Sequence, residues 1–395
     1  MRVGFRALAA AAALLVSACG GAPVAITHST VPHLAGGVGA FDVIEIDQKA
    51  HRLYAADRSD SGVDVFDTSQ SPARFVTTIT TSADPSGLAV APDRGFVYAG
   101  LSDGSVAVID TMTDALVKEV PTGAKSIDLI EYAAEAHAVF AASGADGTIA
   151  KVDAQSLTVA SVFKIGSALE QPRFNPADHL LYVTGSGADA LFRLDPNSGR
   201  VEDKLPLNGC SPRGLAINPK QDQALIACSS WVLRMDLRNP SDLHAYTQVG
   251  GGDVIIYDAA VDRFFVAAPG AKPSEVAVFG GSPIDYVTSV NTGGLGNSAA
   301  YDEASHVVFT PDVIPGRAGL DEFKAPAGDL FFSIPTSAVA LFGGLIAAAL
   351  VFLFVIGRLA DPIRKPVPAP PPAAPVGAAV RPGARKWSRK DVSSG

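Results

Sequence analysis

The chain has 395 residues, 48% hydrophobic and only 18% charged, so it can bury a sizeable core as one large domain or two ordinary ones. Its 38 glycines and 28 prolines are typical of many short strands joined by turns and argue against a helical bundle. The net charge is −9, and nearly all of the 40 acidic residues lie between two apolar end segments, so we expect the main domain to repel nucleic-acid phosphates.

Residues 1–19 are typical of an export signal peptide. Two arginines precede a short apolar stretch, and this stretch is too short to span a bilayer. The sequence VSAC at 16–19 is similar to the lipobox of bacterial lipoproteins, with Cys19 as the lipidated residue. Ordinary cleavage after Ala18, which leaves Cys19 unmodified, is the alternative.

The body of the chain, residues 20–330, is a repeat. An apolar strand that ends in Asp recurs every 41 to 43 residues, at Asp67, Asp110, Asp153, Asp195 and Asp236. A second apolar strand recurs upstream in seven copies, at 52–56, 96–100, 138–142, 180–184, 224–228, 264–268 and 306–310. Each unit predicts four strands, with Gly-rich hairpin turns between them. A repeat of this length predicts a blade, and seven copies predict an all-β, seven-bladed β-propeller.

The seventh copy is short. It has strands near 298–302, 306–312 and 320–323, but its fourth strand is missing. The segment 24–34, ahead of the first copy, has the character of a spare fourth strand. We expect this N-terminal strand to close blade seven, which removes two free sheet edges from the ring.

The repeats carry a family resemblance. It is clearest at PSGLAV over 85–90, VAVID over 106–110 and LYVT over 181–184, and again over 210–236. The chain resembles the YVTN family of seven-bladed propellers, which includes YncE-like exported bacterial proteins, over roughly residues 24–327. The resemblance implies the fold and a binding or cell-surface role, and it implies no shared catalytic signature.

Two cysteines lie on either side of a predicted hairpin whose turn centres near Lys220. The hairpin brings Cys228 opposite the region of Pro212, within reach of Cys210. In an oxidising compartment we expect these two residues to form a structural disulfide. Two buried thiols are the alternative.

The C-terminal region predicts a membrane anchor over 331–357. Its charge-free run at 334–356 would make a helix of about 35 Å, long enough to span a bilayer. A buried core helix is the alternative, but the basic residues that follow place residues 358–395 in the cytoplasm by the positive-inside rule. This tail holds a proline-rich stretch at 366–375, a spacer or partner ligand, and a basic segment at 381–390 that contacts anionic lipid or stays solvated.

The histidines and sequence motifs of the chain do not predict a metal site or a catalytic site. Four of the seven histidines share one repeat position and so cannot converge on one ion: His51, His137, His179 and His306. His28 and His33 lie in the closing segment, without acidic neighbours in the sequence. The chain has no Ser-His-Asp order, phosphate-binding loop or haem motif, and we expect no catalytic residue, metal or cofactor.

Acidic residues at the first strands of the blades are the best candidates for chemistry. First strands line the central channel of a propeller, and a hydrolytic propeller needs acids from several blades around one ion. The candidate channel-lining residues are Glu45, Asp128, Glu170 and Asp253.

The sequence therefore predicts a non-catalytic binding scaffold on the cell membrane, with the propeller on the periplasmic or extracellular side. We expect a protein partner or a small ligand at one propeller face, where loops carry recognition. Two alternatives stay open. One is a lactonase-like hydrolase with a metal at the channel mouth, and the other is an accessory subunit of a membrane complex.

Overall fold

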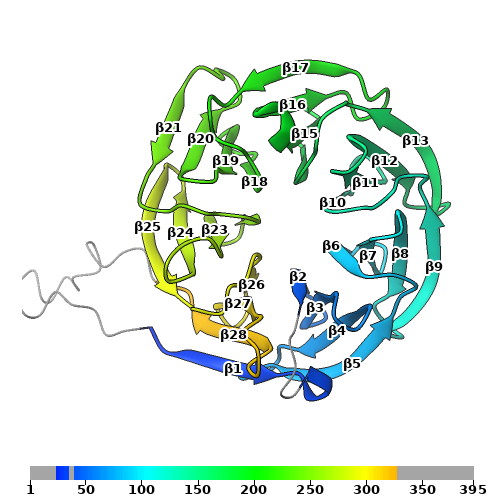
Figure 1. Ribbon diagram of the computed structural model, residues 1–395, viewed down its shortest axis with the longest axis vertical. Helices are drawn as coiled ribbons and strands as arrows, with labels where there is room; N and C mark the ends of the chain where they lie inside the picture. Colours follow the sequence, from blue (N-terminus) through cyan, green and yellow to red (C-terminus); the bar gives the residue numbers. More distant parts are fainter. Residues whose placement is uncertain (1–23, 35–39, 327–395) are drawn as a thin grey trace, which may run out of the picture. The chain divides into compact units, whose positions relative to one another are not determined.

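The computed structural model describes residues 24–34 and 40–326. They form seven four-stranded antiparallel sheets, arranged as blades around a central axis (Figure 1). The all-β, seven-bladed propeller expected from the repeat is confirmed. The predicted signal peptide, Cys19, the predicted span at 331–357 and the tail lie outside the described residues. Within the described ranges, no helix is long and apolar enough to cross a membrane.

Each of the first six blades uses four consecutive strands, and the innermost strand comes first in the chain. Blade one is β2–β5 (Phe41–Asp47, Arg52–Asp57, Gly62–Asp67, Arg74–Thr80), and blade two is β6–β9 (Pro85–Ala91, Phe96–Leu101, Ser105–Asp110, Ala115–Pro121). Blade three is β10–β13 (Ile130–Ala133, Ala138–Ser143, Thr148–Asp153, Thr158–Lys164), and blade four is β14–β17 (Pro172–Asn175, Leu180–Gly185, Ala190–Leu194, Val201–Pro206). Blade five is β18–β21 (Leu215–Asn218, Gln223–Ala227, Val232–Asp236, Leu243–Tyr246), and blade six is β22–β25 (Ile255–Asp258, Arg263–Ala268, Glu275–Gly281, Ile284–Asn291).

Blade seven combines the two ends of the described chain. Its strands are β26 (Ala300–Asp302), β27 (Val307–Asp312), β28 (Gly319–Lys324) and β1 (Ile26–Thr30), and β1 is the outermost. β1 runs antiparallel to β28, in a register from Ile26 opposite Phe323 to Thr30 opposite Gly319 (Figure 1). The predicted closure of blade seven by the N-terminal segment is therefore confirmed, and the short helix η1 (Pro32–Leu34) follows it.

The hydrophobic core lies between blades. The second strand of each blade carries a large side chain that packs against the next blade, as Tyr54 of β3 packs with Leu88 and Val97 of blade two. Tyr54 and its repeat equivalent Tyr98 are fully buried. Outermost strands such as β9 are mostly exposed, with only one buried residue. A single blade cannot bury both faces of its sheet, so the ring is the stable unit.

The histidines that share one repeat position have a backbone role. Each lies in the turn before the second strand, at a position where the backbone is left-handed in every blade: His51, Gly95, His137, His179, Asp222, Asp262 and His306. Gly, Asn, Asp and His tolerate this conformation best. The turn therefore explains the repeated histidines without a ligand.

Candidate functional site

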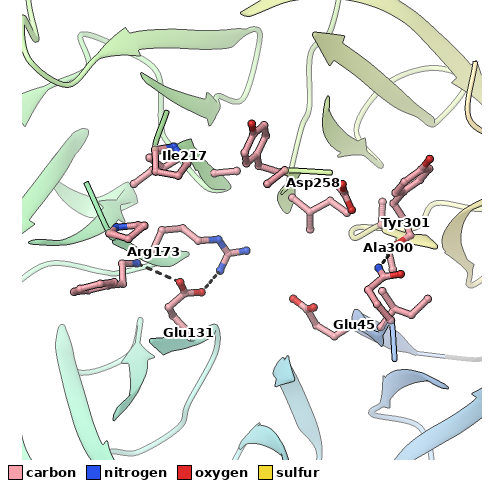
Figure 2. Close-up of a pocket in the computed structure, with 17 residues that line it drawn as sticks. Glu45, Glu131, Arg173, Ile217, Asp258, Ala300 and Tyr301 are labelled. Carbon is pink, nitrogen blue, oxygen red and sulfur yellow. Dashed lines mark hydrogen bonds and ion pairs between the residues drawn. The ribbon is translucent and has the colours of Figure 1, made fainter. Parts of the chain in front are cut away.

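The innermost strands surround a cavity of about 400 Å³ at their carboxyl ends (Figure 2). Its wall includes Glu45 of β2, Glu131 of β10, Arg173 of β14, and Asp258 of β22. Tyr301 of β26 adds an aromatic ring. Because these residues come from five blades, closing the ring is what assembles the site.

Glu131 and Arg173 form the fixed part of the cavity wall. Arg173 Nη1 donates to Glu131 Oε2 at 3.1 Å, and the amide of Phe174 donates to Glu131 Oε1 at 3.2 Å. Arg173 Nη2 also reaches the carbonyl of Ile255 at 3.4 Å. Burial raises the pKa of Glu131, while Arg173 opposes this rise. The guanidinium is therefore committed to protein groups in blades three, four and six.

Glu45 is a second glutamate in the cavity wall. Its carboxylate points into the cavity (Figure 2), and among the described residues it has no ion pair or side-chain hydrogen bond. Burial raises the pKa of Glu45 to about 7, with Arg173 lowering it and Glu131 raising it. The ionised form of a carboxyl group whose pKa is raised by burial is stabilised by a positively charged group brought into the cavity.

The other three predicted channel acids gather at the amino ends of the innermost strands. Burial raises the pKa of Asp128 to about 7, with further increases from Asp42, Glu170 and Asp253. Burial likewise raises the pKa of Asp253 to about 6. The structure thus groups three of the four predicted residues and separates Glu45, which lies inside β2 and not at its start.

Asp42 completes this acidic group, and the sequence prediction missed it. Arg58 Nη1 donates to Asp42 Oδ2 at 3.1 Å, and Asn297 Nδ2 donates to Oδ1 at 2.7 Å. The sequence feature that could have identified Asp42 is its position near the start of the first strand of its blade, as for Asp128 in blade three. Arg213 Nη1 similarly lies 3.5 Å from Asp253 Oδ2. At the amino-terminal end of the channel, Arg58 and Arg213 therefore each pair with one acidic residue of this group.

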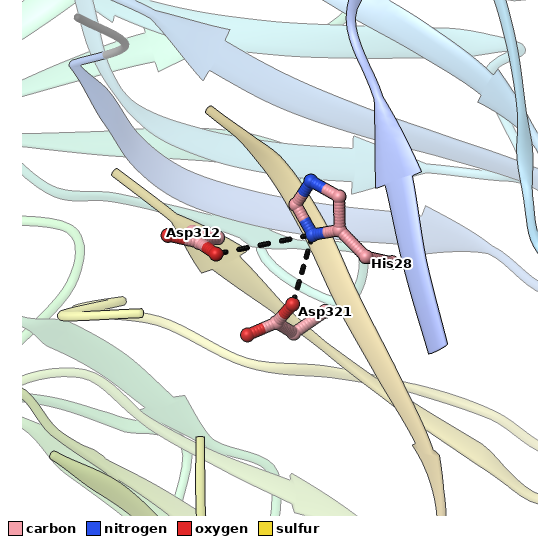
Figure 3. Close-up of side chains that lie close together, drawn as sticks. All are labelled: His28, Asp312 and Asp321. Carbon is pink, nitrogen blue, oxygen red and sulfur yellow. Dashed lines mark hydrogen bonds and ion pairs between the residues drawn. The ribbon is translucent and has the colours of Figure 1, made fainter. Parts of the chain in front are cut away.

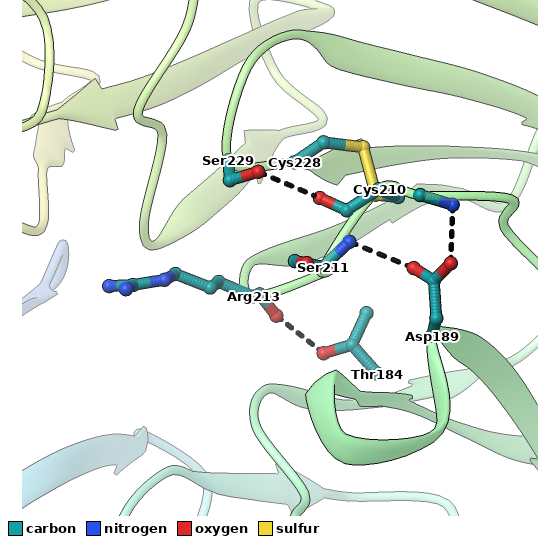
Figure 4. The surroundings of a disulfide bond; sticks show 8 residues. Thr184, Asp189, Cys210, Ser211, Arg213, Cys228 and Ser229 are labelled. Atoms are coloured by element: carbon teal, nitrogen blue, oxygen red, sulfur yellow. Dashed lines mark hydrogen bonds between the residues drawn. A yellow bond between two sulfur atoms is a disulfide. The ribbon is translucent and has the colours of Figure 1, made fainter.

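Cys210 and Cys228 are joined by a disulfide, with their sulfur atoms 2.01 Å apart (Figure 4). The bond fixes the loop between β17 and β18 to the end of β19. Asp189 accepts hydrogen bonds from this loop, including one of 2.8 Å from the amide of Ser211. Figure 4 shows Arg213 leaving the same loop, and its guanidinium reaches Asp253. The disulfide therefore anchors the loop from which Arg213 extends to Asp253.

Two groups of metal-ligand side chains lie away from the channel. One is His28, Asp312 and Asp321 in blade seven (Figure 3), and the other is His33, Asp57 and Asp64. In each group, the donor atoms of the three side chains lie within 4.8 Å of one another. The described ranges contain these two groups. The acids come from strands that approach the closing segment only in the folded ring, which is why the sequence showed no partner for either histidine.

Comparisons with known proteins support the fold. No family model matches the chain, and no curated protein does. A solved structure of Kuenenia stuttgartiensis hydrazine synthase is similar, with 13% identity and a TM-score of 0.62, over 74% of this chain and 97% of that one. A chain of a mitotic checkpoint complex is similar at 10% identity and a TM-score of 0.62, over 78% of this chain and 95% of that one. Likeness at these identities shows the seven-bladed propeller fold alone.

Proposed function

We propose that the chain is a non-catalytic binding protein whose channel cavity takes a small ligand with a positively charged amine group. The observation that carries this proposal is the Glu45 carboxylate, which faces the cavity without a partner among the described residues. A cavity of about 400 Å³ is of the size that binds small molecules.

The charge of the wall favours a cation over an anion. The one basic side chain among the described lining residues is Arg173, and Glu131 already holds it. Glu45 stays available on the acidic side, and Asp258 adds negative charge while its Oδ1 accepts from the amides of Ala260 and Val261. Tyr257 offers an aromatic ring at the cavity wall, and such a ring adds attraction for an ammonium group.

Binding is favoured over hydrolysis by the chemistry of the wall. No Ser, Thr, Cys or His is among the described residues that line the cavity, so it offers none of the usual hydroxyl or thiol nucleophiles. The grouped metal-ligand side chains lie at the closing segment instead of in the channel. A lactonase-like hydrolase with a channel-mouth metal is therefore the weaker proposal.

The proposed location is the outer side of the cell membrane. The export signal, the apolar run at 331–357 and the basic tail support it, together with Cys19 as a second anchor. The disulfide between Cys210 and Cys228 adds support, because disulfides persist in oxidising compartments.

Calorimetric titration of the protein purified from membranes in detergent tests the ligand class. Matched small amines, alcohols and carboxylates are compared, and we expect binding for amines only. Glu45→Gln should weaken amine binding at least about tenfold, the cost of losing one buried charge pair. Glu135→Gln, at an exposed glutamate outside the cavity wall, is the matched control.

Amine binding should strengthen as pH rises through about 7, because Glu45 then loses its proton. Carboxylate binding in place of amine binding contradicts the proposal, as does unchanged affinity in Glu45→Gln.

A second candidate, an accessory subunit of a membrane complex, draws on the proline-rich and basic tail over 358–395. It predicts that deletion of residues 331–395 abolishes co-purification of a membrane protein. Unchanged co-purification contradicts it.

A further inference from the structure

Three side chains with donor atoms within 4.8 Å of one another meet where the closing segment reaches blade one: His33, Asp57 and Asp64. His33 follows β1, in the helix η1, and its Nε2 atom lies 3.2 Å from Asp57 Oδ2 and 3.8 Å from Asp64 Oδ2. A third carboxylate oxygen, Asp60 Oδ2, lies 3.7 Å from the same nitrogen. Donor atoms bound tetrahedrally at 2.0–2.2 Å to one ion stand about 3.4 Å apart. The observed distances bracket this value.

Hydrogen bonds leave one oxygen of each buried carboxylate directed at His33. Asp57 Oδ1 accepts from the amide of Ser59 at 2.8 Å, and Asp64 Oδ1 accepts from Thr78 Oγ1 at 2.6 Å. Both aspartates are fully buried, yet Asp64 Oδ2 has no hydrogen-bond partner in the structure. Second-shell contacts of this kind orient metal ligands. A buried, unpartnered carboxylate oxygen is costly unless a cation is present.

Comparison of the blades shows that the acid pair is specific. In blades one and seven the last residue of the second strand and the third residue of the next strand are both Asp. The equivalent pairs of blades two to six contain no acid: Leu101 and Ala107, Ser143 and Ala150, Gly185 and Phe192, Cys228 and Leu233, and Ala268 and Ala277. The fold therefore does not require acids at these positions.

Blade seven shows what the acid pair needs. There, Arg317 Nη2 lies 2.5 Å from Asp312 Oδ2 and 3.7 Å from Asp321 Oδ1. Figure 3 shows the same two acids beside His28. A protein cation thus neutralises the pair. In blade one, no Lys or Arg nitrogen within the described ranges comes within 4.0 Å of Asp57 or Asp64. His33 is the basic side chain beside the pair, and a cation bound between them would supply further balancing charge.

We propose that His33, Asp57 and Asp64 form a zinc-type divalent cation site that locks the closing segment onto blade one, with the exposed Asp60 carboxylate beside it. One imidazole and two carboxylates suit Zn²⁺, which accepts nitrogen and oxygen donors in tetrahedral geometry and takes water at a fourth position. Calcium prefers a larger set of oxygen donors alone. Because His33 belongs to the closing segment and the acids to blade one, the ion joins two parts of the chain that ring closure brings together.

The test uses the protein purified from membranes in detergent, without a polyhistidine tag. After treatment with a chelator, the chain is titrated with Zn²⁺ by calorimetry, and bound metal is counted by mass spectrometry. We expect one Zn²⁺ per chain at this site and a rise in melting temperature on binding. His33→Ala should weaken Zn²⁺ binding about tenfold or more, and Asp64→Asn should abolish it.

His28→Ala is the matched control, since it alters the equivalent histidine in the blade that already holds Arg317. It should keep Zn²⁺ affinity unchanged. Without metal, His33→Ala loses only the hydrogen bond to Asp57 and the ring contact with Phe75, so Zn²⁺ should raise the melting temperature of wild type more than that of the variant. Absence of Zn²⁺ binding by the wild type overturns the proposal. So does equal affinity in wild type and His33→Ala, or preference for Ca²⁺ over Zn²⁺.

Discussion

Gln171 pairs with the backbone of Ile255 as a neighbouring strand would. Its Nε2 donates to the carbonyl of Ile255 at 3.2 Å, and its Oε1 accepts from the amide of Ile255 at 3.2 Å. The same Oε1 accepts from the amide of Leu215 at 2.7 Å. Gln171 precedes β14 in blade four, whereas Leu215 and Ile255 begin the innermost strands of blades five and six. One buried side chain thus joins three consecutive blades.

Replacing Gln171 with Leu should lower the free energy of unfolding by about 3 kcal/mol, because it leaves the buried amides of Leu215 and Ile255 without acceptors. Urea denaturation followed by tryptophan fluorescence measures this loss. Gln248→Leu, at an exposed glutamine, should change stability by less than about 0.5 kcal/mol. Equal stability of the two variants would show that Gln171 does not bridge the blades.

The sequence predicted the strands of each blade and the closure of blade seven, but not the side-chain contacts between blades. The spacing of Asp67, Asp110 and Asp153 was sufficient for the blades, and the missing fourth strand of copy seven was sufficient for the closure. Strand alternation reports burial within a blade. It does not report which side chains of neighbouring blades meet, so neither the Gln171 bridge nor the acids around His33 could be predicted.

The candidate channel residues show the same limit. Asp128, Glu170 and Asp253 were placed near one another because each precedes an innermost strand. Glu45 lies further along β2, and at about 3.3 Å per residue it stands about 10 Å beyond Asp42. It therefore belongs to the cavity at the other end of the strands. The sequence indicates that Glu45 belongs to a channel-lining strand, but it does not give the end of the channel that the carboxylate faces.

Glu322 should contribute strongly to ring closure. It is 2% exposed on β28, where Oε1 accepts from Ser29 Oγ of β1 and from the amide of Ala73 in blade one, each at 2.5 Å. Glu322→Ala removes the acceptor that these two buried donors share, so we expect a loss of about 3 kcal/mol in urea denaturation. Glu303→Ala, at an exposed glutamate, should cost less than about 0.5 kcal/mol. Similar losses in both variants contradict this role.

The disulfide between Cys210 and Cys228 should stabilise the propeller by about 3 kcal/mol, since it closes a loop across a sequence separation of 18 residues. Wild type should therefore melt at a lower temperature after reduction. A chain carrying Cys210→Ser and Cys228→Ser should melt at that lower temperature whether or not reductant is present. Cys19→Ser, which leaves the disulfide intact, should keep the response to reductant. A double variant that still responds to reductant contradicts the prediction.

Asp128 should make the propeller less stable as pH rises. Burial, assisted by Asp42, Glu170 and Asp253, raises its pKa from 3.8 to about 7 in the folded chain. Between these two values the folded state holds a proton that the unfolded state has released, so the free energy of unfolding falls as pH increases. Below the lower value both states are protonated, and the effect disappears.

Asp128→Asn should remove this part of the pH dependence. At pH 8 the variant should be more stable than wild type by about 2 kcal/mol, roughly half of what the full shift implies, because solvent still reaches Asp128. At pH 4 the two chains should be equally stable. Urea denaturation at a series of pH values measures the difference, and the exposed Asp285→Asn should follow wild type throughout. Parallel curves for wild type and Asp128→Asn would mean that Asp128 ionises normally in the folded ring.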